Sequence, residues 1–462
     1  MKPNILFFFT DDQRFDTIRA LGNRTIHTPN LDALVAAGTV FTHAHIPGGS
    51  CGAVCMPSRA MLHTGRTLYH IECEGQEIPS SHVTLGECLQ GAGYVTFGTG
   101  KWHNGAAAYA RGFGCGDEIF FGGMEDHWMV PLCAFDPTGQ YRARSPYIRN
   151  PWLSNRVEIR SCDHFSPGRH STDIFADASI RFIETWSGAQ PFFLYTSLMA
   201  PHDPRSMPEQ FRSLYDPERI DLPPNFCAEH PIDTGALRIR DEQLAAFPRD
   251  PVEIRRHIAE YYAMITHLDH ALGRVLEALR KKGVIDNTII IFAADNGLAV
   301  GQHGLMGKQS VYDHSVRVPL IFAGPGIPRG QKRGALAYLL DIFPTVCGLT
   351  GTPVPDSVEG LSLLPCLRDP GVGLRDALYL AYADSIRGVT DGRHKLVEYV
   401  CGATQLFDLE RDPFEMQNLA VLDSSKTTLS GLRQKLVQMA GEWGDAAHPT
   451  GEVFWRRWNP GA

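Results

Sequence analysis

The sequence lacks any apolar run long enough to cross a membrane, which excludes an ordinary membrane-spanning helix. It also lacks an excess of basic residues. Its 43 lysines and arginines stand against 51 aspartates and glutamates, and the net charge is −8. A protein that binds nucleic acid through a basic face usually carries the opposite balance. We therefore expect neither a membrane nor a nucleic acid among the partners of this chain.

Closely spaced cysteines are also missing, apart from Cys51 and Cys55. Eleven cysteines without a CxxC pair form neither a disulfide framework nor a zinc-binding pattern. Most of them, such as Cys88 and Cys347, are expected to be small buried apolar residues. This cysteine usage favours a reducing compartment.

The sequence begins with MKPNILFFFTDD, which is too short for a signal peptide and is typical of a first strand. The chain as written therefore predicts a cytoplasmic protein. A removed leader would instead make it periplasmic or secreted.

What the sequence does have is an alternation of short apolar runs with amphipathic segments. Strands are predicted at 4–10, 39–46, 95–100, 191–199, 288–295 and 318–324, and helical patterns lie between them, the longest at 251–283. Continuous apolar strands between helices are typical of the α/β class. They predict a large, mainly parallel sheet sandwiched by helices.

Two segments break this alternation. Residues 104–170 hold Gly, Pro, Arg and aromatic residues with no clear period, and so predict long functional loops. Beyond about Pro365, four short runs predict an antiparallel sheet, and a last helix follows. We therefore predict a large N-terminal catalytic domain over 1–364 and a smaller C-terminal α+β subdomain over 365–462.

Acidic and amide side chains lie at the ends of two predicted strands, where open parallel sheets bind ligands. Asp11 and Asp12 follow the first strand, and Asp295 and Asn296 close the run at 288–295. Each pair alone is typical of a helix cap or a tight turn. Together they offer three carboxylates and an amide oxygen, a set suited to Ca²⁺ or Mg²⁺.

Lysine and histidine side chains lie at other strand ends. They are Lys101 and His103, then His202, and then His303 and Lys308 beyond the second acidic pair. Each alone is typical of an exposed lysine or a hydrogen-bonded loop histidine. Several such groups facing a cation site predict a pocket for an anion with several oxygens.

The stretch CMPSRAMLHTGR begins at Cys55. A helix predicted from Ser58, with Pro57 in its first turn, places this thiol at a helix N-terminus, which favours an anion or a nucleophile. Arg59 and Arg66 add positive charge, although a capping cysteine with solvated arginines is the alternative. A thiolate is a poor partner for a hard cation, so the chemistry favours oxygen at this position.

These motifs resemble those of the type I sulfatases of the alkaline-phosphatase superfamily. The pattern CxPSRxxxxTGR is similar to the family signature, whose cysteine is oxidised to formylglycine. The motifs NILFFFTDDQR, GKWHNG, APHDP and DNG…GQHG…GK stand in the family's order, and QLFDLERDPFEMQNLA resembles its C-terminal hallmark. The resemblance covers nearly the whole chain and implies an alkaline-phosphatase-like fold.

The resemblance also implies residue roles. The metal would be Ca²⁺, with Mg²⁺ as the alternative by ligand type. Its ligands would be Asp11, Asp12, Asp295, Asn296 and the formylglycine made from Cys55. Arg59 would stabilise that modified residue, and the sulfate would lie among Lys101, His103, His202 and Lys308. Neither His303 nor Cys51 receives a role.

The function so implied is that of a sulfuric ester hydrolase, arylsulfatase-like, that releases inorganic sulfate through the gem-diol of the formylglycine. The expected substrate is a sulfated sugar or oligosaccharide, with Trp128 and Arg144 as candidates for binding it. A formylglycine-generating enzyme would act on the chain during maturation. The alternatives are a formylglycine-dependent phosphonate monoester or phosphodiester hydrolase and an inactive binding homologue. The sequence gives no indication of an oligomeric state.

Overall fold

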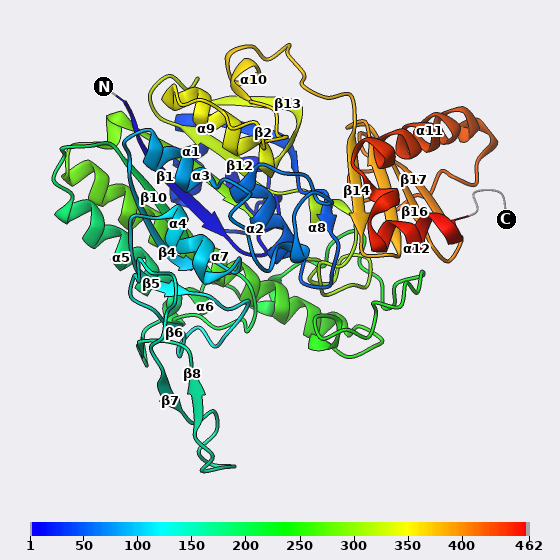
Figure 1. Cartoon of the computed structure of the whole chain (residues 1–462). Helices are drawn as coiled ribbons and strands as arrows, with labels where there is room; N and C mark the ends of the chain where they lie inside the picture. Colours follow the sequence, from blue (N-terminus) through cyan, green and yellow to red (C-terminus); the bar gives the residue numbers. More distant parts are fainter. Residues whose placement is uncertain (1, 459–462) are drawn as a thin grey trace.

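An eight-stranded sheet dominates the computed structural model, which describes residues 2–458 (Figure 1). Its strand order is β13-β2-β12-β11-β1-β10-β4-β5. The strands are β1 (Asn4–Thr10), β2 (Gly38–His45), β4 (Val95–Lys101), β5 (Cys115–Phe120), β10 (Phe192–Ser197), β11 (Thr288–Ala294), β12 (Leu320–Ala323) and β13 (Gln331–Tyr338). Neighbouring strands are parallel, except that β12 runs antiparallel to both β11 and β2. The predicted mainly parallel sheet is confirmed.

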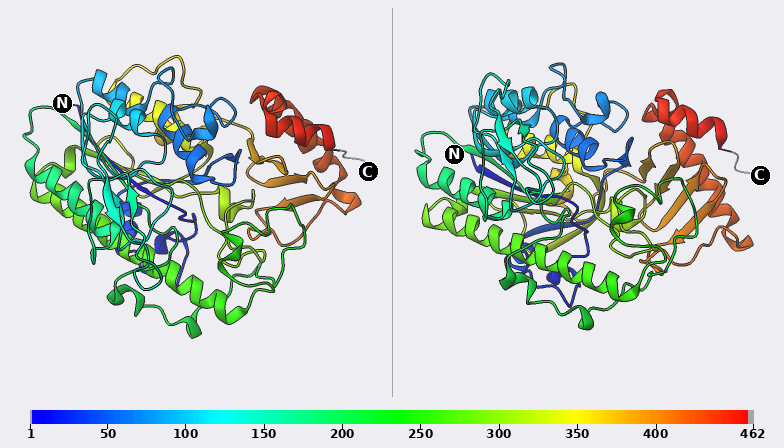
Figure 2. Two further views of the ribbon diagram at one scale, coloured as in Figure 1. Left: turned by 60° about the horizontal axis from the view of Figure 1, so that its bottom comes forward. Right: turned by 90° about the horizontal axis from the view of Figure 1, so that it is seen from below.

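Helices cover both faces of this sheet, as Figures 1 and 2 show. One face packs against α2 (Cys55–Thr64), α3 (Leu85–Gly91), α4 (Ala106–Gly112) and α9 (Ile342–Thr350), and the other against α1 (Pro29–Ala37), α5 (Ser171–Thr185) and α7 (Pro251–Lys281). In β1, Phe7 and Phe9 join the first layer while Leu6 and Phe8 join the second. Burial on both faces explains why this strand is continuously apolar in sequence.

The central strands set the position of the polar residues that follow them. In register, Phe9 of β1 lies beside Ala293 of β11 and Ser197 of β10, and Ser197 lies beside Gly100 of β4. Four parallel strands therefore end side by side at one edge of the sheet. Every polar segment predicted from a strand end leaves the sheet from this edge.

The smaller C-terminal domain contains the antiparallel sheet that the sequence predicts. Its strands are β14 (Leu378–Tyr382), β15 (Ile386–Thr390), β16 (His394–Tyr399) and β17 (Thr404–Asp408), and α11 (Lys426–Glu442) and α12 (Pro449–Arg457) follow. The exact boundary after residue 364 stays a prediction, and the outer ends of the two ranges, residues 1 and 459–462, lie outside the described residues.

A two-residue strand joins the C-terminal sheet to the N-terminal part of the chain. This strand, β3 (Gly48–Gly49), pairs in parallel with β14, so that Gly48 lies beside Ala381. No sequence pattern pointed to it, because two glycines have no apolar period. The segment immediately ahead of Cys55 is thereby held by the C-terminal sheet.

The prediction of irregular loops over 104–170 is wrong for its first part. Helix α4 and strand β5 lie there, and β5 is the last strand of the large sheet. Helix α4 is only seven residues long, and β5 (CGDEIF) lacks the apolar run that marks the other strands of this sheet. The remainder holds two small hairpins, β6 (Pro131–Leu132) with β9 (His164–Phe165) and β7 (Ser145–Tyr147) with β8 (Glu158–Arg160).

The cysteines form no disulfide within the described residues, and all eleven are free. Cys347 is buried as predicted, whereas Cys88 is half-buried with its Sγ 3.8 Å from that of Cys347.

Three short helices, α6 (Glu209–Arg212), α8 (Asp313–Val316) and α10 (Leu364–Arg368), lie in connecting segments. In the described part of the chain, none of the helices combines the length and the apolar character that crossing a membrane requires.

One buried ion pair ties the C-terminal helices to their sheet. The Asp445 carboxylate accepts two bonds from Arg387, at 2.7 and 2.9 Å, and one from Trp455 Nε1 at 2.7 Å. Both charged residues are fully buried. The substitution Asp445→Ala leaves an uncompensated buried guanidinium, and we expect it to lower the free energy of unfolding by about 3–5 kcal/mol.

Chemical denaturation of the two proteins measures this change. The control is Glu452→Ala, which removes an ion pair with Arg456 whose side chains are both 68% exposed. That control should change the free energy of unfolding by less than about 0.5 kcal/mol. Equal effects of the two substitutions would contradict the assignment.

Candidate active site

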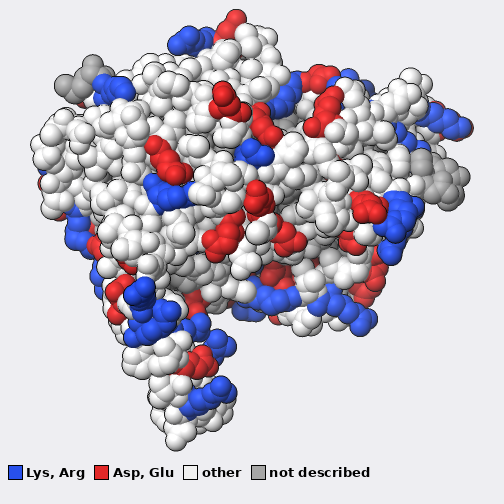
Figure 3. Space-filling model, viewed as in Figure 1, with Lys and Arg blue, Asp and Glu red and all other residues white. Residues whose placement is uncertain are grey.

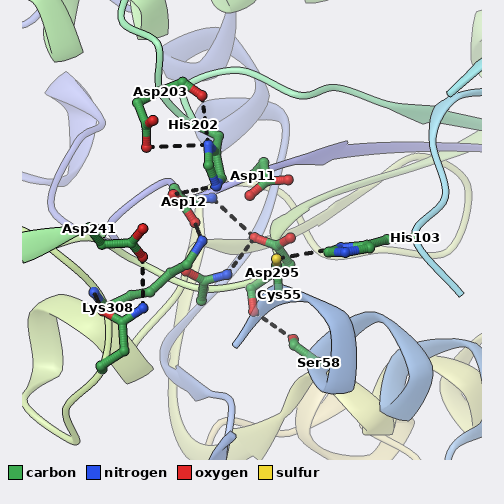
Figure 4. Close-up of polar contacts among 12 residues, drawn as sticks. Asp11, Asp12, Cys55, Ser58, His103, His202, Asp203, Asp241, Asp295 and Lys308 are labelled. Atoms are coloured by element: carbon green, nitrogen blue, oxygen red, sulfur yellow. Dashed lines mark hydrogen bonds and ion pairs between the residues drawn. The ribbon is translucent and has the colours of Figure 1, made fainter. Parts of the chain in front are cut away.

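The carboxyl edge of the sheet brings the predicted site residues together (Figure 4). Asp11 and Asp12 leave β1, and Asp295 and Asn296 leave β11, all of them buried. Helix α2 points its N-terminus at the same place. It begins at Cys55, three residues before the predicted start at Ser58.

The Arg59 guanidinium lies at the centre of this arrangement and is fully buried. Its Nε donates to Asp295 Oδ2 at 2.7 Å, and one terminal nitrogen donates to Asp11 Oδ2 at 3.1 Å. The other donates to the Lys101 carbonyl at 3.0 Å and to Ser197 Oγ at 2.7 Å. One side chain from α2 thus contacts the ends of β1, β11, β4 and β10.

Three oxygens of the acidic and amide residues remain without a hydrogen-bond partner although they are buried. They are Asp11 Oδ1, Asp12 Oδ2 and Asn296 Oδ1. Buried polar atoms normally have a hydrogen-bond partner, so three unpartnered oxygens in one place indicate a binding site for a ligand. Oxygens of carboxylates and an amide are ligands that a hard divalent cation prefers. The residues present therefore fit the implied metal.

The other oxygens of this group are occupied by hydrogen bonds. Asp295 Oδ1 accepts from the Asp12 backbone N–H at 3.0 Å and from Asn296 Nδ2 at 2.9 Å. Ser58 Oγ donates to the Asp295 carbonyl at 2.6 Å. These bonds hold Asp295 so that it can share a cation with Asp11 and Cys55, whose ligand atoms all lie within 4.8 Å of one another.

Two lysines, Lys101 and Lys308, supply positive charge near Cys55. Lys101 Nζ contacts Asp11 Oδ2 and lies 3.8 Å from the Cys55 thiol, while Lys308 Nζ donates to Asp12 Oδ1 at 2.6 Å. Burial alone raises the pKa of the Asp11 carboxyl, but Lys101 and then Arg59 hold that pKa below its ordinary value. Burial raises the pKa of the Cys55 thiol, so this cysteine is not an activated thiolate.

Two histidines complete the ring of side chains. His103 Nδ1 lies 3.5 Å from Cys55 Sγ, and His202 Nε2 lies 3.7 Å from Asp12 Oδ2. Burial, and next Lys101, lowers the pKa of His103 to about 2, whereas burial and then Lys308 lowers that of His202 to about 4. Trp102, between Lys101 and His103, is buried in the core.

Backbone conformation aims some of these side chains. Asp12 has a φ of 60° and His103 a φ of 75°, in the left-handed region that non-glycine residues rarely adopt. Such strained positions persist where surrounding contacts hold them, often at active sites. Gly297 permits the turn after Asn296, because a Cβ there would lie 2.0 Å from the His314 carbonyl oxygen.

A cavity of about 340 Å³ opens above Cys55. His103, His202 and Lys308 line it together with residues that the sequence did not single out, namely Gly52, Ala53, Gly123, Met124, Ile239, Arg240, Asp241 and Gln309. The segment 239–241 belongs to a long irregular connection, and no motif or period marks it. Only the folded chain brings it opposite α2.

Neither Trp128 nor Arg144 lines this cavity. Trp128 packs edge-on against His170, with ring centroids 5.1 Å apart, and the Arg144 guanidinium donates to the carbonyls of Tyr141 and Ala143. A role for either in binding substrate stays a prediction. His303 stacks on Tyr312 with centroids 4.0 Å apart, and Cys51 is half-buried.

The family model "Sulfatase" matches residues 3–352, and a second model, "N-sulphoglucosamine sulphohydrolase, C-terminal", matches residues 301–442. The chain belongs to the sulfatase family. It is therefore a sulfuric ester hydrolase, as the resemblance of its motifs implied. The first match includes every residue predicted for the site.

Two named relatives support this membership over at least 90% of the chain. An arylsulfatase of Clostridium perfringens is 28% identical over 95% of this chain and 94% of its own. An N-acetylglucosamine-6-O-sulfatase of Bacteroides thetaiotaomicron is 25% identical over 90% of this chain and 82% of its own.

Solved structures show the same fold. A protein in complex with its substrate D-glucosamine-2-N,6-O-disulfate superposes with a TM-score of 0.78 at 22% identity, covering 97% of this sulfatase and 99% of the other chain. A phosphonate monoester hydrolase of Agrobacterium radiobacter gives 0.75 at 23% identity, with 96% of each chain covered. The predicted alkaline-phosphatase-like fold is confirmed.

The three unpartnered buried oxygens predict a cation site whose affinity can be measured. After removal of divalent ions with a chelator, Ca²⁺ should raise the melting temperature of the sulfatase, because an ion that binds only the folded state stabilises it, by about 2.7 kcal/mol at 100 times its Kd. In Asp12→Asn, which removes one ligand charge, the affinity measured by calorimetry should fall about tenfold or more.

The matched control is Asp241→Asn, which removes a carboxylate that lines the same cavity but is not grouped with the unpartnered oxygens. Its Ca²⁺ affinity should equal that of the wild type. A wild-type protein whose melting temperature does not respond to Ca²⁺ or Mg²⁺ would contradict the site.

Proposed function

We propose that this sulfatase removes sulfate from a small sulfated sugar, with a formylglycine made from Cys55 and with Ca²⁺ as its cofactors. The observation that carries the proposal is the set of three unpartnered buried oxygens, on residues next to a cavity that Cys55, His103, His202 and Lys308 line. A hard cation fits these oxygens, and an anion fits the lysines.

The position of Cys55 supports its conversion. A thiol is a poor ligand beside a hard cation, whereas an oxygen at this position would add to the donor set of Asp11 and Asp295. When present, formylglycine supplies a hydroxyl nucleophile, and Ca²⁺ lowers the pKa of that hydroxyl and polarises the sulfate. The CxPSR context of the cysteine is the one that the family signature shows.

Lys101 and Lys308 hold the sulfate and offset the charge that develops on its oxygens. Their ammonium groups approach Cys55 from β4 and from the segment after β11, so that an anion above this residue lies between them. Because both are buried and fixed by Asp11 and Asp12, they need no reorganisation as the charge grows.

His202 donates a proton to the leaving alcohol. Its Nδ1 donates to the Asp203 carbonyl at 2.8 Å, which leaves Nε2 as the nitrogen that faces the site. Because that carbonyl holds the proton at Nδ1, His202 can donate from Nε2 only as an imidazolium, a form that the negative charge of a bound sulfate would favour. Asp203 is held in turn by Arg240, whose two terminal nitrogens contact its carboxylate.

The size and lining of the cavity support a sugar substrate. A volume of about 340 Å³ lies at the lower end of the range for small-molecule sites, and suits a terminal sugar unit rather than the interior of a long chain. Met124 and Ile239 offer apolar surface, while Asp241 and Gln309 offer groups that bind hydroxyls. The relatives and neighbours whose names include glucosamine sulfates point to the same substrate class.

The variant Cys55→Ala tests the catalytic assignment. It should fold normally and lose sulfatase activity by at least about a thousandfold, since the nucleophile is gone. The matched control Cys51→Ala changes the neighbouring thiol and should keep wild-type kcat. Mass spectrometry of the peptide that contains residue 55 should show the aldehyde in active wild-type protein.

Two outcomes contradict this assignment. One is substantial sulfatase activity in Cys55→Ala. The other is wild-type protein that carries the aldehyde and yet hydrolyses no sulfate ester, which would indicate an inactive binding homologue.

A substrate panel tests the sugar and the sulfate separately. We expect kcat/KM to be highest for a sulfated monosaccharide or disaccharide, lower for an aryl sulfate, and lowest for a matched phosphodiester. A higher value for the phosphodiester would favour the phosphonate monoester or phosphodiester hydrolase instead. Trp128→Ala and Arg144→Ala should leave the monosaccharide value unchanged and affect only longer chains, because neither residue lines the cavity.

A further inference from the structure

A hairpin projects from the body of the molecule, and we refer to residues 141–162 as the arm (Figure 1). Strands β7 and β8 pair in the half of the arm that is next to the body, with Ser145 beside Arg160. Its base is attached to the body, because Tyr147 stacks on Phe165 at 5.3 Å and Arg160 pairs with Glu125 at 3.4 Å. Beyond these contacts the arm extends into solvent.

The arm gathers apolar side chains that are exposed to solvent. Trp152 is 95% exposed and Leu153 84% exposed, and Ile159, Val157 and Ile148 are 63%, 54% and 38% exposed. These five are a third of the fifteen large apolar residues that are exposed among residues 2–458, and they fall within twelve consecutive positions. Such a concentration marks an interaction surface rather than scattered surface residues.

The arm also carries a charge opposite to that of the rest of the chain. It contains five arginines (142, 144, 149, 156 and 160) and a single acid, Glu158, a net charge of +4 in a chain of net charge −8. The remaining residues therefore carry −12. Of the five arginines, only Arg160 forms an ion pair within residues 2–458.

Figure 3 shows this separation of charge on one face. Lysine and arginine side chains gather on the arm, while aspartate and glutamate side chains gather over the middle of the face above it. An isolated two-stranded hairpin is marginally stable in water, so an arm of this length gains stability from a surface that covers its tip.

We propose that the arm docks on a second copy of this chain. The acidic surface of another copy complements the arginines, and docking there buries Trp152 and Leu153, the two most exposed large apolar side chains among residues 2–458. In a two-fold dimer each copy offers its arm to the other. Each side of the interface then consists of an arm and of the acidic surface that receives the other arm, and both count toward the 20–30 residues that a stable interface usually takes from each partner.

The composition of the tip favours a protein surface over a sulfated polysaccharide. A sugar ring stacks on aromatic side chains, yet four of the five exposed apolar residues are aliphatic. Aliphatic side chains bury well against a protein surface. This proposal does not rest on the proposed function, since it concerns residues outside the catalytic cavity.

Sedimentation velocity of the full chain at several concentrations tests the proposal. The wild type should sediment as a dimer that weakens as the salt concentration rises, because the arginine contacts are screened. The double variants Trp152→Ser with Leu153→Ser, and Arg149→Glu with Arg156→Glu, should raise the dissociation constant at least about 30-fold.

Matched controls away from the arm are Val421→Ser, which changes a side chain of a residue that is 80% exposed, and Arg219→Glu, whose side chain is 88% exposed. Both should keep the wild-type dissociation constant, and all variants should keep the wild-type circular dichroism spectrum. A wild type that stays monomeric at every concentration overturns the proposal. So does an oligomer that the arm variants leave unchanged, and so does a monomer that binds dextran sulfate through the arm.

Discussion

A buried guanidinium, that of Arg59, lets two acidic strand ends approach each other at the sheet edge. Asp11 and Asp295 come from different strands, and without a cation between them their like charges would repel in a medium of low dielectric constant. Arg59 bonds to both carboxylates and to groups at the ends of β4 and β10. Asp11, Asp295, the end of β4 at Lys101 and the first turns of α2 are therefore held in one arrangement before any metal binds.

The hydrogen bonds of Arg59 also determine which oxygens remain for a ligand. Asp11 contacts Arg59 and Lys101 through Oδ2, and its Oδ1 remains without a partner. Asp12 contacts Lys308 through Oδ1, and its Oδ2 remains without a hydrogen-bond partner. An arrangement that satisfied all of the oxygens internally would leave nothing to attract a cation. The site is thus stable enough to fold, yet incomplete in a way that a hard cation can correct.

The sequence predicts that these polar residues gather at one edge of the sheet, because the strands before them are continuously apolar and end abruptly. The run NILFFFT ends before Asp11, and the run TIIIFAA ends before Asp295. The end of each apolar run therefore marks the edge of the sheet. Features that depend on pairing between distant segments leave no such mark. The antiparallel direction of β12, the pairing of β3 with β14 and the placement of Ile239–Asp241 above Cys55 all belong to this class. Helix α4 and strand β5 were missed for a different reason, since α4 is only seven residues long and β5 (CGDEIF) is not an apolar run.

The pairing of β3 with β14 has a consequence for the order of events during synthesis. Gly48 emerges from the ribosome long before Ala381, its neighbour in the C-terminal sheet, so the segment ahead of Cys55 has no sheet to join while most of the chain is still being made. In the finished protein Cys55 is only 3% exposed, at the floor of a narrow cavity. If a formylglycine-generating enzyme converts Cys55, as we propose, its access is therefore greatest before the C-terminal strands are made, and the late pairing of β3 with β14 places this modification before the fold is complete.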